Sequence, residues 1–165
     1  MKYCINIMKK TLIRIDFADY SDNPRANARI FEKALYAAEK ILLREKGPKK
    51  VRGCISLALT DDSLIKKINN KYRHIDAPTD VVSLGWIDEK PFVSDVDRFE
   101  NLIGEIFISV ETAEKNAKED GKDTSDELVF LFVHGLLHIF GYDHLQEAEK
   151  KSMFALQDEI MELIS

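Results

Sequence analysis

Three of the four histidines in the chain lie within the eleven-residue run HGLLHIFGYDH, which extends from His134 to His144. His134 and His138 are four residues apart, and on a helix this spacing places two side chains on one face, one turn apart. Two imidazole nitrogens placed in this way can reach one ion at about 2.0–2.1 Å. Gly141 can adopt the left-handed conformation that ends a helix, so the chain can return His144 to the same point. The run therefore predicts a metal site with three histidine ligands.

The ligand set indicates which metal the site takes. Neutral imidazoles suit Zn²⁺ best, although Ni²⁺ and Cu²⁺ also accept them. A structural zinc normally has four protein ligands, whereas three ligands leave a position open for water or substrate. We therefore expect one catalytic Zn²⁺ per chain, which lowers the pKa of a bound water to about 7. Without a metal, the imidazoles would need hydrogen-bond partners that these apolar neighbours do not offer: Phe132, Leu136, Leu137 and Ile139.

The residue after the first histidine bears on the class of substrate. The spacing H-x-x-x-H-x-x-G-x-x-H is also that of metzincin proteases, which place a glutamate directly after the first histidine as general base. Here this position is Gly135, which has no side chain. A peptidase without its base would lose a large factor in rate. The sequence therefore favours a hydrolase that acts on something else, and a metzincin-like peptidase or another zinc hydrolase is the alternative.

A second candidate group lies in the polar segment 69–83. Arg73 is a fixed cation whose planar donor fork suits phosphate oxygens. Lys66, Lys67 and Lys71 lie just upstream on an expected helix. The alternative is a solvated helix end, where the helix dipole favours cations. On these residues alone, the helix-end interpretation is the favoured one.

Apolar periodicity predicts the elements that position these groups. The strands are expected at residues 11–17, 51–59, 81–86 and 102–110. The helices are expected at residues 26–46, 62–72, 111–120, 128–140 and 145–164. An N-cap is expected within Thr60-Asp61-Asp62, and a capping box at 124–127. Residues 1–10 are expected to form a loose leader, residues 22–24 a turn and residues 89–100 an acidic surface loop. In the last helix, one apolar side is expected to contain Ala148, Met153, Leu156, Ile160 and Leu163.

The fold class expected from this order of elements is α+β. One domain over residues 11–165 would contain a four-stranded mixed sheet covered by about five helices, with a zincin-like metal site. A length of 165 residues fits one domain, and 45% hydrophobic with 32% charged residues excludes a disordered chain. The formal net charge of −5 excludes a strongly cationic nucleic-acid coat but permits a local basic patch.

The sequence also indicates where in the cell the protein lies. No apolar run reaches the roughly 18 residues that a membrane helix needs. The first ten residues have neither the long apolar region nor the cleavage site of a secretory signal. We therefore expect a cytoplasmic protein without a membrane partner.

The motifs, taken in order, resemble those of the YbeY family of bacterial endoribonucleases. The resemblance covers about residues 57–153, and its motifs are Tyr72-Arg73, PTDVVS at 78–83, Gly104-Glu105-Ile106 and the histidine run. It implies a single-domain, zinc-dependent RNase specific for single strands. Such an enzyme would mature ribosomal RNA, notably the 3′ end of the 16S RNA, and act in ribosome quality control. RNA and the ribosome or its assembly proteins would be its partners.

The resemblance assigns roles residue by residue. It makes His134, His138 and His144 the zinc ligands and Arg73 the family's functional arginine. Two motifs depart from the family pattern: Ser83-Leu84-Gly85 replaces the usual Ser-Phe-Pro, and Gly104-Glu105-Ile106 replaces Gly-Asp-Ile. The first departure affects the expected cleft wall, and the second moves a carboxylate outward by one methylene.

Other residues near the motifs have less specific interpretations. Asp143 is a candidate for supporting a metal ligand or for proton transfer, although a plain turn residue before His144 is at least as good an interpretation. Glu105 is a weaker candidate for the same role. Tyr142 is expected in packing, and Trp86 in the core or a cleft wall. A ribosome-assembly factor whose zinc is structural is the non-enzymatic alternative.

Overall fold

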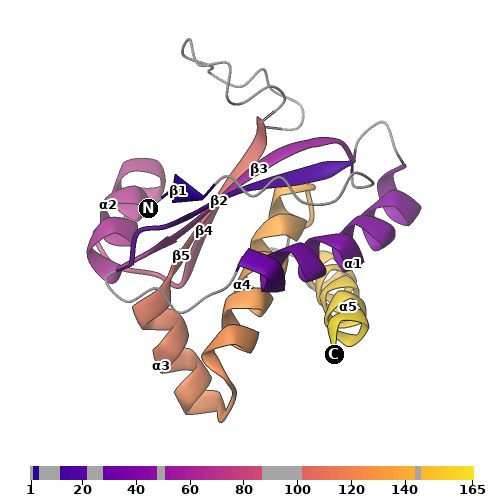
Figure 1. The fold of residues 1–165 in the computed structure, drawn as a ribbon. Helices are drawn as coiled ribbons and strands as arrows, with labels where there is room; N and C mark the ends of the chain where they lie inside the picture. Colours follow the sequence, from indigo (N-terminus) through magenta and orange to yellow (C-terminus); the bar gives the residue numbers. More distant parts are fainter. Residues whose placement is uncertain (1, 4–11, 22–27, 48–50, 87–101, 144–145) are drawn as a thin grey trace.

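The computed structural model describes residues 2–3, 12–21, 28–47, 51–86, 102–143 and 146–165. Its strands are β1 (Lys2–Tyr3), β2 (Ile13–Asp19), β3 (Gly53–Thr60), β4 (Val81–Gly85) and β5 (Leu102–Ser109). Its helices are α1 (Ala28–Lys46), α2 (Asp62–Arg73), α3 (Val110–Asp120), α4 (Thr124–Ile139) and α5 (Glu147–Ile164) (Figure 1). The expected turn at 22–24, the acidic loop at 89–100 and His144 lie outside the described residues.

The strands form one mixed sheet in the order β1-β2-β3-β5-β4. β2, β3 and β5 are parallel, and β1 and β4 run antiparallel to their neighbours at the two edges. The expected mixed sheet is therefore confirmed in strands β2 to β5. A fifth, short strand is added by Lys2 and Tyr3, which pair with Ala18 and Phe17 although the sequence places them in a loose leader.

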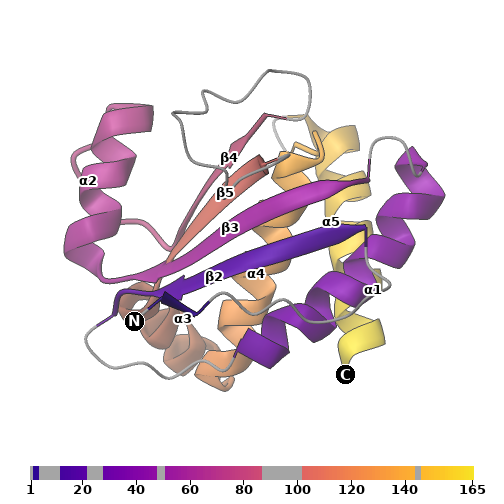
Figure 2. The ribbon, with the colours of Figure 1, turned by 45° about the horizontal axis from the view of Figure 1, so that its top comes forward.

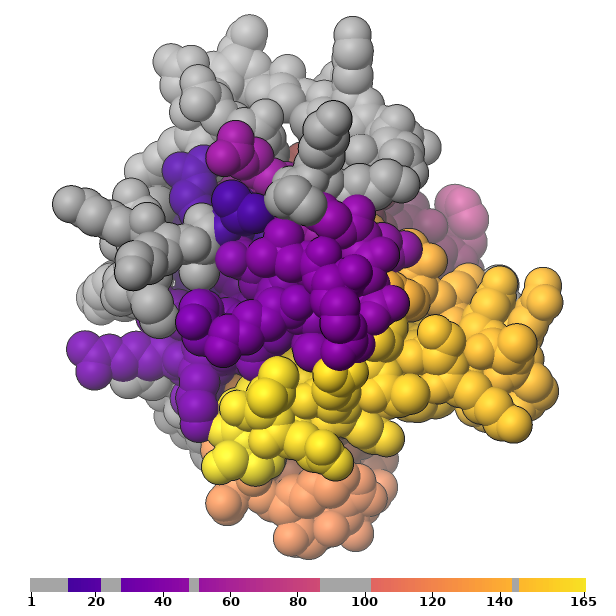
Figure 3. Space-filling model, turned by 90° about the vertical axis from the view of Figure 1, so that its right-hand side faces the viewer, coloured from indigo at the N-terminus to yellow at the C-terminus, as the bar shows by residue number. Residues whose placement is uncertain are grey.

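The core lies between one face of the sheet and helices α1, α4 and α5. Figure 2 shows the strands in front of these three helices, and Figure 3 shows α1 and α5 side by side on the outer surface. Phe17 of β2 contacts Phe31 of α1 with ring centroids 5.6 Å apart, and Phe31 contacts Phe132 of α4 at 5.5 Å. This chain of buried rings fixes α4, the helix that contains the histidine pair, relative to the sheet.

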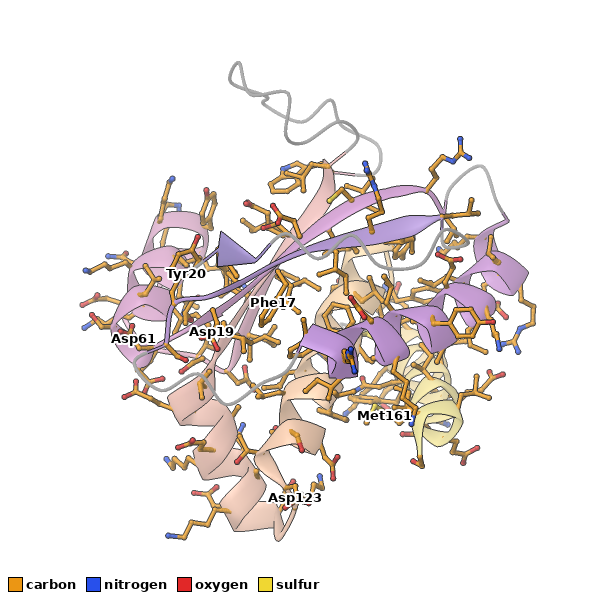
Figure 4. All side chains as sticks on the ribbon, in the orientation of Figure 1. Phe17, Asp19, Tyr20, Asp61, Asp123 and Met161 are labelled. Carbon is orange, nitrogen blue, oxygen red and sulfur yellow. The ribbon has the colours of Figure 1, made fainter. Side chains whose placement is uncertain are left out.

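The start of α2 agrees with the cap predicted from the sequence, whereas the start of α4 does not. Asp61 is the N-cap of α2, as expected, and its Oδ1 accepts the Leu64 N–H at 2.6 Å. The capping box expected at 124–127 is wrong, because α4 begins at Thr124 with Asp123 as N-cap and no side-chain cap bond. The Glu127 carboxyl is buried and hydrogen-bonds Asn116 of α3 instead. Figure 4 shows Asp61 and Asp123 where α2 and α4 begin.

The last helix buries a narrower stripe than the sequence predicts. Met153, Leu156 and Ile160 are buried as expected. Ala148 and Leu163 are exposed, so their assignment to the buried side is wrong. Both lie in the terminal turns of α5, and in the last turn Met161 and Ile164 pack against the core in place of Leu163. No helix in the described part of the chain is both long and apolar enough to span a bilayer.

Candidate functional site

Helix α4 packs very closely against strands β4 and β5 because glycines lie between them. A Cβ on Gly104 would lie 2.5 Å from Cδ1 of Ile139, and a Cβ on Gly85 would lie 3.1 Å from the Ile139 Cα. A Cβ on Gly135 would lie 3.1 Å from Cγ2 of Ile106. These contacts hold the C-terminal half of α4 against the edge strand β4 and its neighbour β5 (Figure 1).

Gly135 has a packing role that accounts for the missing glutamate. The residue is buried and faces Ile106 on β5. A glutamate here would have to enter the helix–sheet interface and place its carboxylate among apolar side chains, which is costly. The site therefore has no room for a general base of the metzincin type at this position.

His134 and His138 come together as their spacing predicts. Their Nε2 atoms are 3.1 Å apart, and their ring centroids are 4.8 Å apart at an interplanar angle of 75°. Two nitrogens that bind one tetrahedral ion at 2.0–2.1 Å are separated by about 3.3–3.4 Å. The two histidines are half-buried, so solvent reaches them. The pair therefore fits two ligands of one Zn²⁺, both through Nε2.

A buried amide supports His134 from the side opposite the pair. The Oε1 atom of Gln157 on α5 lies 3.0 Å from Nδ1 of His134, and the Gln157 side chain is fully buried. Gln157 lies outside every motif that the sequence offers. The available signal was a polar residue inside the apolar stripe of α5, between Leu156 and Ile160.

The chain turns after the second histidine where the sequence predicts. Gly141 has a φ of 82°, in the left-handed region that favours glycine. Its N–H donates to the His138 carbonyl at 2.9 Å, and the Tyr142 N–H donates to the Leu137 carbonyl at 3.0 Å. His144 lies outside the described residues. Among the residues that are described, no three His, Cys, Asp or Glu side chains are grouped so that they could hold a metal.

Arg73 is the last residue of α2, and its side chain is exposed. The helix ends at His74, which has a φ of 60° and donates its N–H to the Asn70 carbonyl at 3.1 Å. Buried Asn69 donates from Nδ2 to the Ala77 carbonyl at 2.9 Å, which holds the segment between α2 and β4. Arg73 has no hydrogen bond or ion pair with another described residue. Its guanidinium is therefore available to an external anion.

Two of the lysines upstream of Arg73 have partners of their own. Lys66 pairs with Asp76 at 3.5 Å, and Lys71 lies over the Tyr72 ring at 4.9 Å from its centroid. Within the described residues, no hydrogen bond or ion pair joins Arg73 to the histidine pair. The two candidate groups therefore lie on separate elements, α2 and α4, that both pack against β4.

Glu105 lies on the face of the sheet that points away from α4. Side chains alternate along a strand, and its neighbour Ile106 packs against Gly135 of α4. Burial raises the pKa of the Glu105 carboxyl, and the nearby Lys71 of α2 partly opposes this shift. The sheet thus separates Glu105 from the histidine pair, which argues against a proton-transfer role beside those ligands.

The E105Q variant is expected to keep its cleavage rate and to gain stability at pH 7, by about 1–2 °C in Tm. Because burial raises the pKa of the Glu105 carboxyl above its ordinary value, the native state binds more protons than the unfolded chain, and stability falls as the pH rises through this window. Glutamine does not ionise, so E105Q does not lose this stability at pH 7. Below about pH 4 the Glu105 carboxyl is protonated, and the two proteins should be equally stable. Thermal melts at pH 4 and pH 7 measure this difference, with RNA cleavage measured on the same samples. If E105Q folds but cleaves RNA more slowly, Glu105 takes part in the reaction.

Three further residues have the positions expected of packing or turn residues. Tyr142 is half-buried against the core, and the Lys46 Nζ lies 4.4 Å from its ring centroid, so its packing role is confirmed. Trp86 is half-buried and follows β4, with its N–H bonded to the Ile103 carbonyl at 2.9 Å. Asp143 is half-buried just after the Gly141 turn.

Comparisons with known proteins agree with this fold and these motifs. The family model described as "Endoribonuclease YbeY" matches residues 17–165. A curated protein of this name from Listeria innocua is 36% identical over 159 residues, which cover 92% of this chain and 96% of that protein. Another from Persephonella marina is 48% identical over 111 residues, covering 67% of this chain and 69% of that protein.

A solved structure shows the same arrangement in space. The solution structure of TM1509 from Thermotoga maritima has a TM-score of 0.57 and 28% identity. The match covers 92% of this chain and 88% of that one.

These matches define an enzyme class, that of hydrolases that cleave phosphodiester bonds within RNA. The chain belongs to the YbeY family of endoribonucleases. The resemblance seen in the sequence motifs is therefore confirmed, and neither the peptidase nor the non-enzymatic alternative gains support.

Proposed function

We propose that this chain is a zinc-dependent endoribonuclease, specific for single-stranded RNA, that processes ribosomal RNA in the cytoplasm. Its substrates would include the 3′ end of the 16S RNA, and its wider role would lie in ribosome biogenesis and quality control. The observation that carries the proposal is the pair of Nε2 atoms, 3.1 Å apart, on α4 of a YbeY-family chain. The ribosomal substrate is inferred from the family resemblance.

His134, His138 and His144 would hold the metal. The first two converge through Nε2, and Gly141 turns the chain just before the third. Three neutral imidazoles leave the full 2+ charge of the ion in place, which suits an anionic phosphodiester. When bound, Zn²⁺ supplies a Lewis acid for a phosphoryl oxygen and lowers the pKa of a bound water to about 7.

Arg73 would bind the phosphate of the substrate. Its guanidinium can donate two parallel hydrogen bonds to phosphate oxygens, and no described residue competes for it. Asn69 supports this role indirectly, because its bond to the Ala77 carbonyl holds the segment that follows Arg73. Binding the phosphate would orient the scissile bond and stabilise negative charge that develops on its oxygens.

The overall charge of the chain bears on the partner. A formal net charge of −5 repels RNA at long range, so the attraction must come from a few local cations. A protein of this kind gains affinity when a ribosomal surface holds the RNA in place, because the second contact is then intramolecular. We therefore propose the ribosome or its assembly proteins as partners.

Zinc-loaded protein is expected to cut an unpaired RNA fragment from the 16S 3′ region. The same fragment annealed to its complement should be cut at least about tenfold more slowly, because a paired backbone is held in a regular helix that resists extrusion into a site. Gel analysis of end-labelled RNA measures both rates, and casein serves as the peptidase control. Equal cleavage of the duplex would contradict the proposed single-strand specificity. Cleavage of casein without cleavage of RNA would favour the peptidase alternative.

A further inference from the structure

We propose that Gln157 is a positioning residue for His134. It would hold the imidazole as the tautomer with hydrogen on Nδ1 and direct the bare Nε2 toward the metal. The part of this inference that concerns the metal rests on the proposed function, whereas the tautomer is a property of the metal-free protein. Gln157 lies on α5, 23 residues from His134 in the sequence.

The tautomer follows from the identity of the contacting atoms. His134 Nδ1 lies 3.0 Å from Oε1 of Gln157, and an amide oxygen can only accept a hydrogen bond. The hydrogen must therefore be on Nδ1. A neutral imidazole protonated at Nδ1 has its lone pair on Nε2, the atom that faces His138.

The orientation of the amide is fixed in turn by the backbone of α4. The Gln157 Nε2 atom donates to the Phe130 carbonyl at 3.5 Å. A flipped amide would place its oxygen against that carbonyl oxygen, so the contact selects the orientation that presents Oε1 to His134. Phe130 is one turn before His134 on the same helix. The same segment of α4 therefore contacts both the oxygen and the nitrogen of the Gln157 amide.

The surroundings of His134 restrict its ring further. The Phe130 ring stacks on the imidazole with centroids 6.5 Å apart and an interplanar angle of 20°, and the Phe154 ring lies 6.4 Å away. Gln157 is fully buried between Leu156 and Ile160, where an unsatisfied amide would be costly. The bond to His134 is therefore a built feature of the α4–α5 interface. Partners of this kind, on the far side of a metal-binding histidine, typically change metal affinity by 10–100-fold.

The test uses Q157M and Q157E in the full chain. Methionine is similar in size to glutamine and apolar, so it suits the stripe on α5 but cannot accept from Nδ1–H. Glutamate keeps one oxygen facing Nδ1–H, and its protonated form, favoured by full burial, still donates to the Phe130 carbonyl, so it should preserve the interaction. L156M, a change at the adjacent buried position, is the matched packing control.

Two readouts separate this proposal from the proposed function. Nitrogen-15 NMR of the metal-free protein, at a pH where imidazoles are neutral, should report hydrogen on Nδ1 of His134 in wild type, Q157E and L156M but not uniformly in Q157M. Zn²⁺ titration against a chromophoric chelator should show a 10–100-fold weaker affinity for Q157M. Circular dichroism confirms that each variant is folded.

The outcomes point in different directions. Hydrogen on Nε2 of His134 in the wild type would overturn the proposal, as would a folded Q157M with the wild-type tautomer and wild-type zinc affinity. Wild-type protein that has the expected tautomer but binds no zinc would contradict the proposed function while supporting the role of Gln157.

Discussion

Replacing His138 with alanine is expected to remove the bound zinc and reduce RNA cleavage to the metal-free background. The loss should be on the order of 1000-fold or more, because without the ion nothing lowers the pKa of the attacking water. His138 supplies one of the two Nε2 atoms that lie 3.1 Å apart. Elemental analysis of the purified variant measures the zinc, and single-turnover cleavage of the 16S fragment measures the rate.

The matched control is H74N. His74 is the C-cap of α2 with a φ of 60°, and asparagine tolerates this conformation. The control removes an imidazole from another part of the chain, so zinc content and cleavage should match the wild type. A folded H138A protein that keeps its zinc and its activity would show that His138 is not a ligand of the metal.

The R73A variant is expected to fold and to bind zinc normally but to cleave RNA tens to hundreds of times more slowly. The guanidinium has no acceptor with which to ligate a cation, so its loss should leave the metal in place. Removing a charge-assisted bond aimed at the transition state costs on the order of 2–4 kcal/mol. R73K should recover only part of the rate, because an ammonium lacks the bidentate fork. Single-turnover cleavage at saturating protein measures the effect.

K67A is the matched control for Arg73. Lys67 is an exposed cation on the same helix, so its loss changes the net charge equally without removing the guanidinium. Its rate at saturation should stay within about threefold of wild type, since exposed cations act mainly on encounter and binding. Wild-type cleavage by R73A would leave Arg73 as a helix-end cation. Loss of zinc or of the fold in R73A would make it structural.

Local signals predicted the elements and the histidine pair well. The four-residue spacing on an apolar helix is sufficient to bring the two imidazoles together. The left-handed conformation of Gly141 is also predictable, because it depends only on the end of the same helix. The Asp61 cap was also predictable, since a cap bond joins residues three apart. Such features depend on the residues within one or two helical turns.

Features that depend on distant residues were missed. The capping box at 124–127 failed because Glu127 is buried against α3, where Asn116 binds its carboxyl. The role of Glu105 depended on which face of β5 is covered by α4, which strand alternation alone does not determine. Gln157 supports a histidine from 23 residues away, so only its polarity within an apolar stripe was visible in the sequence.

The metal content of freshly purified wild-type protein tests the central claim most directly. Elemental analysis should find close to one zinc per chain. A chelator should remove both the zinc and the cleavage of the 16S fragment, and added Zn²⁺ should restore both. Protein that contains no metal, binds none on titration and still cleaves the RNA would contradict the account.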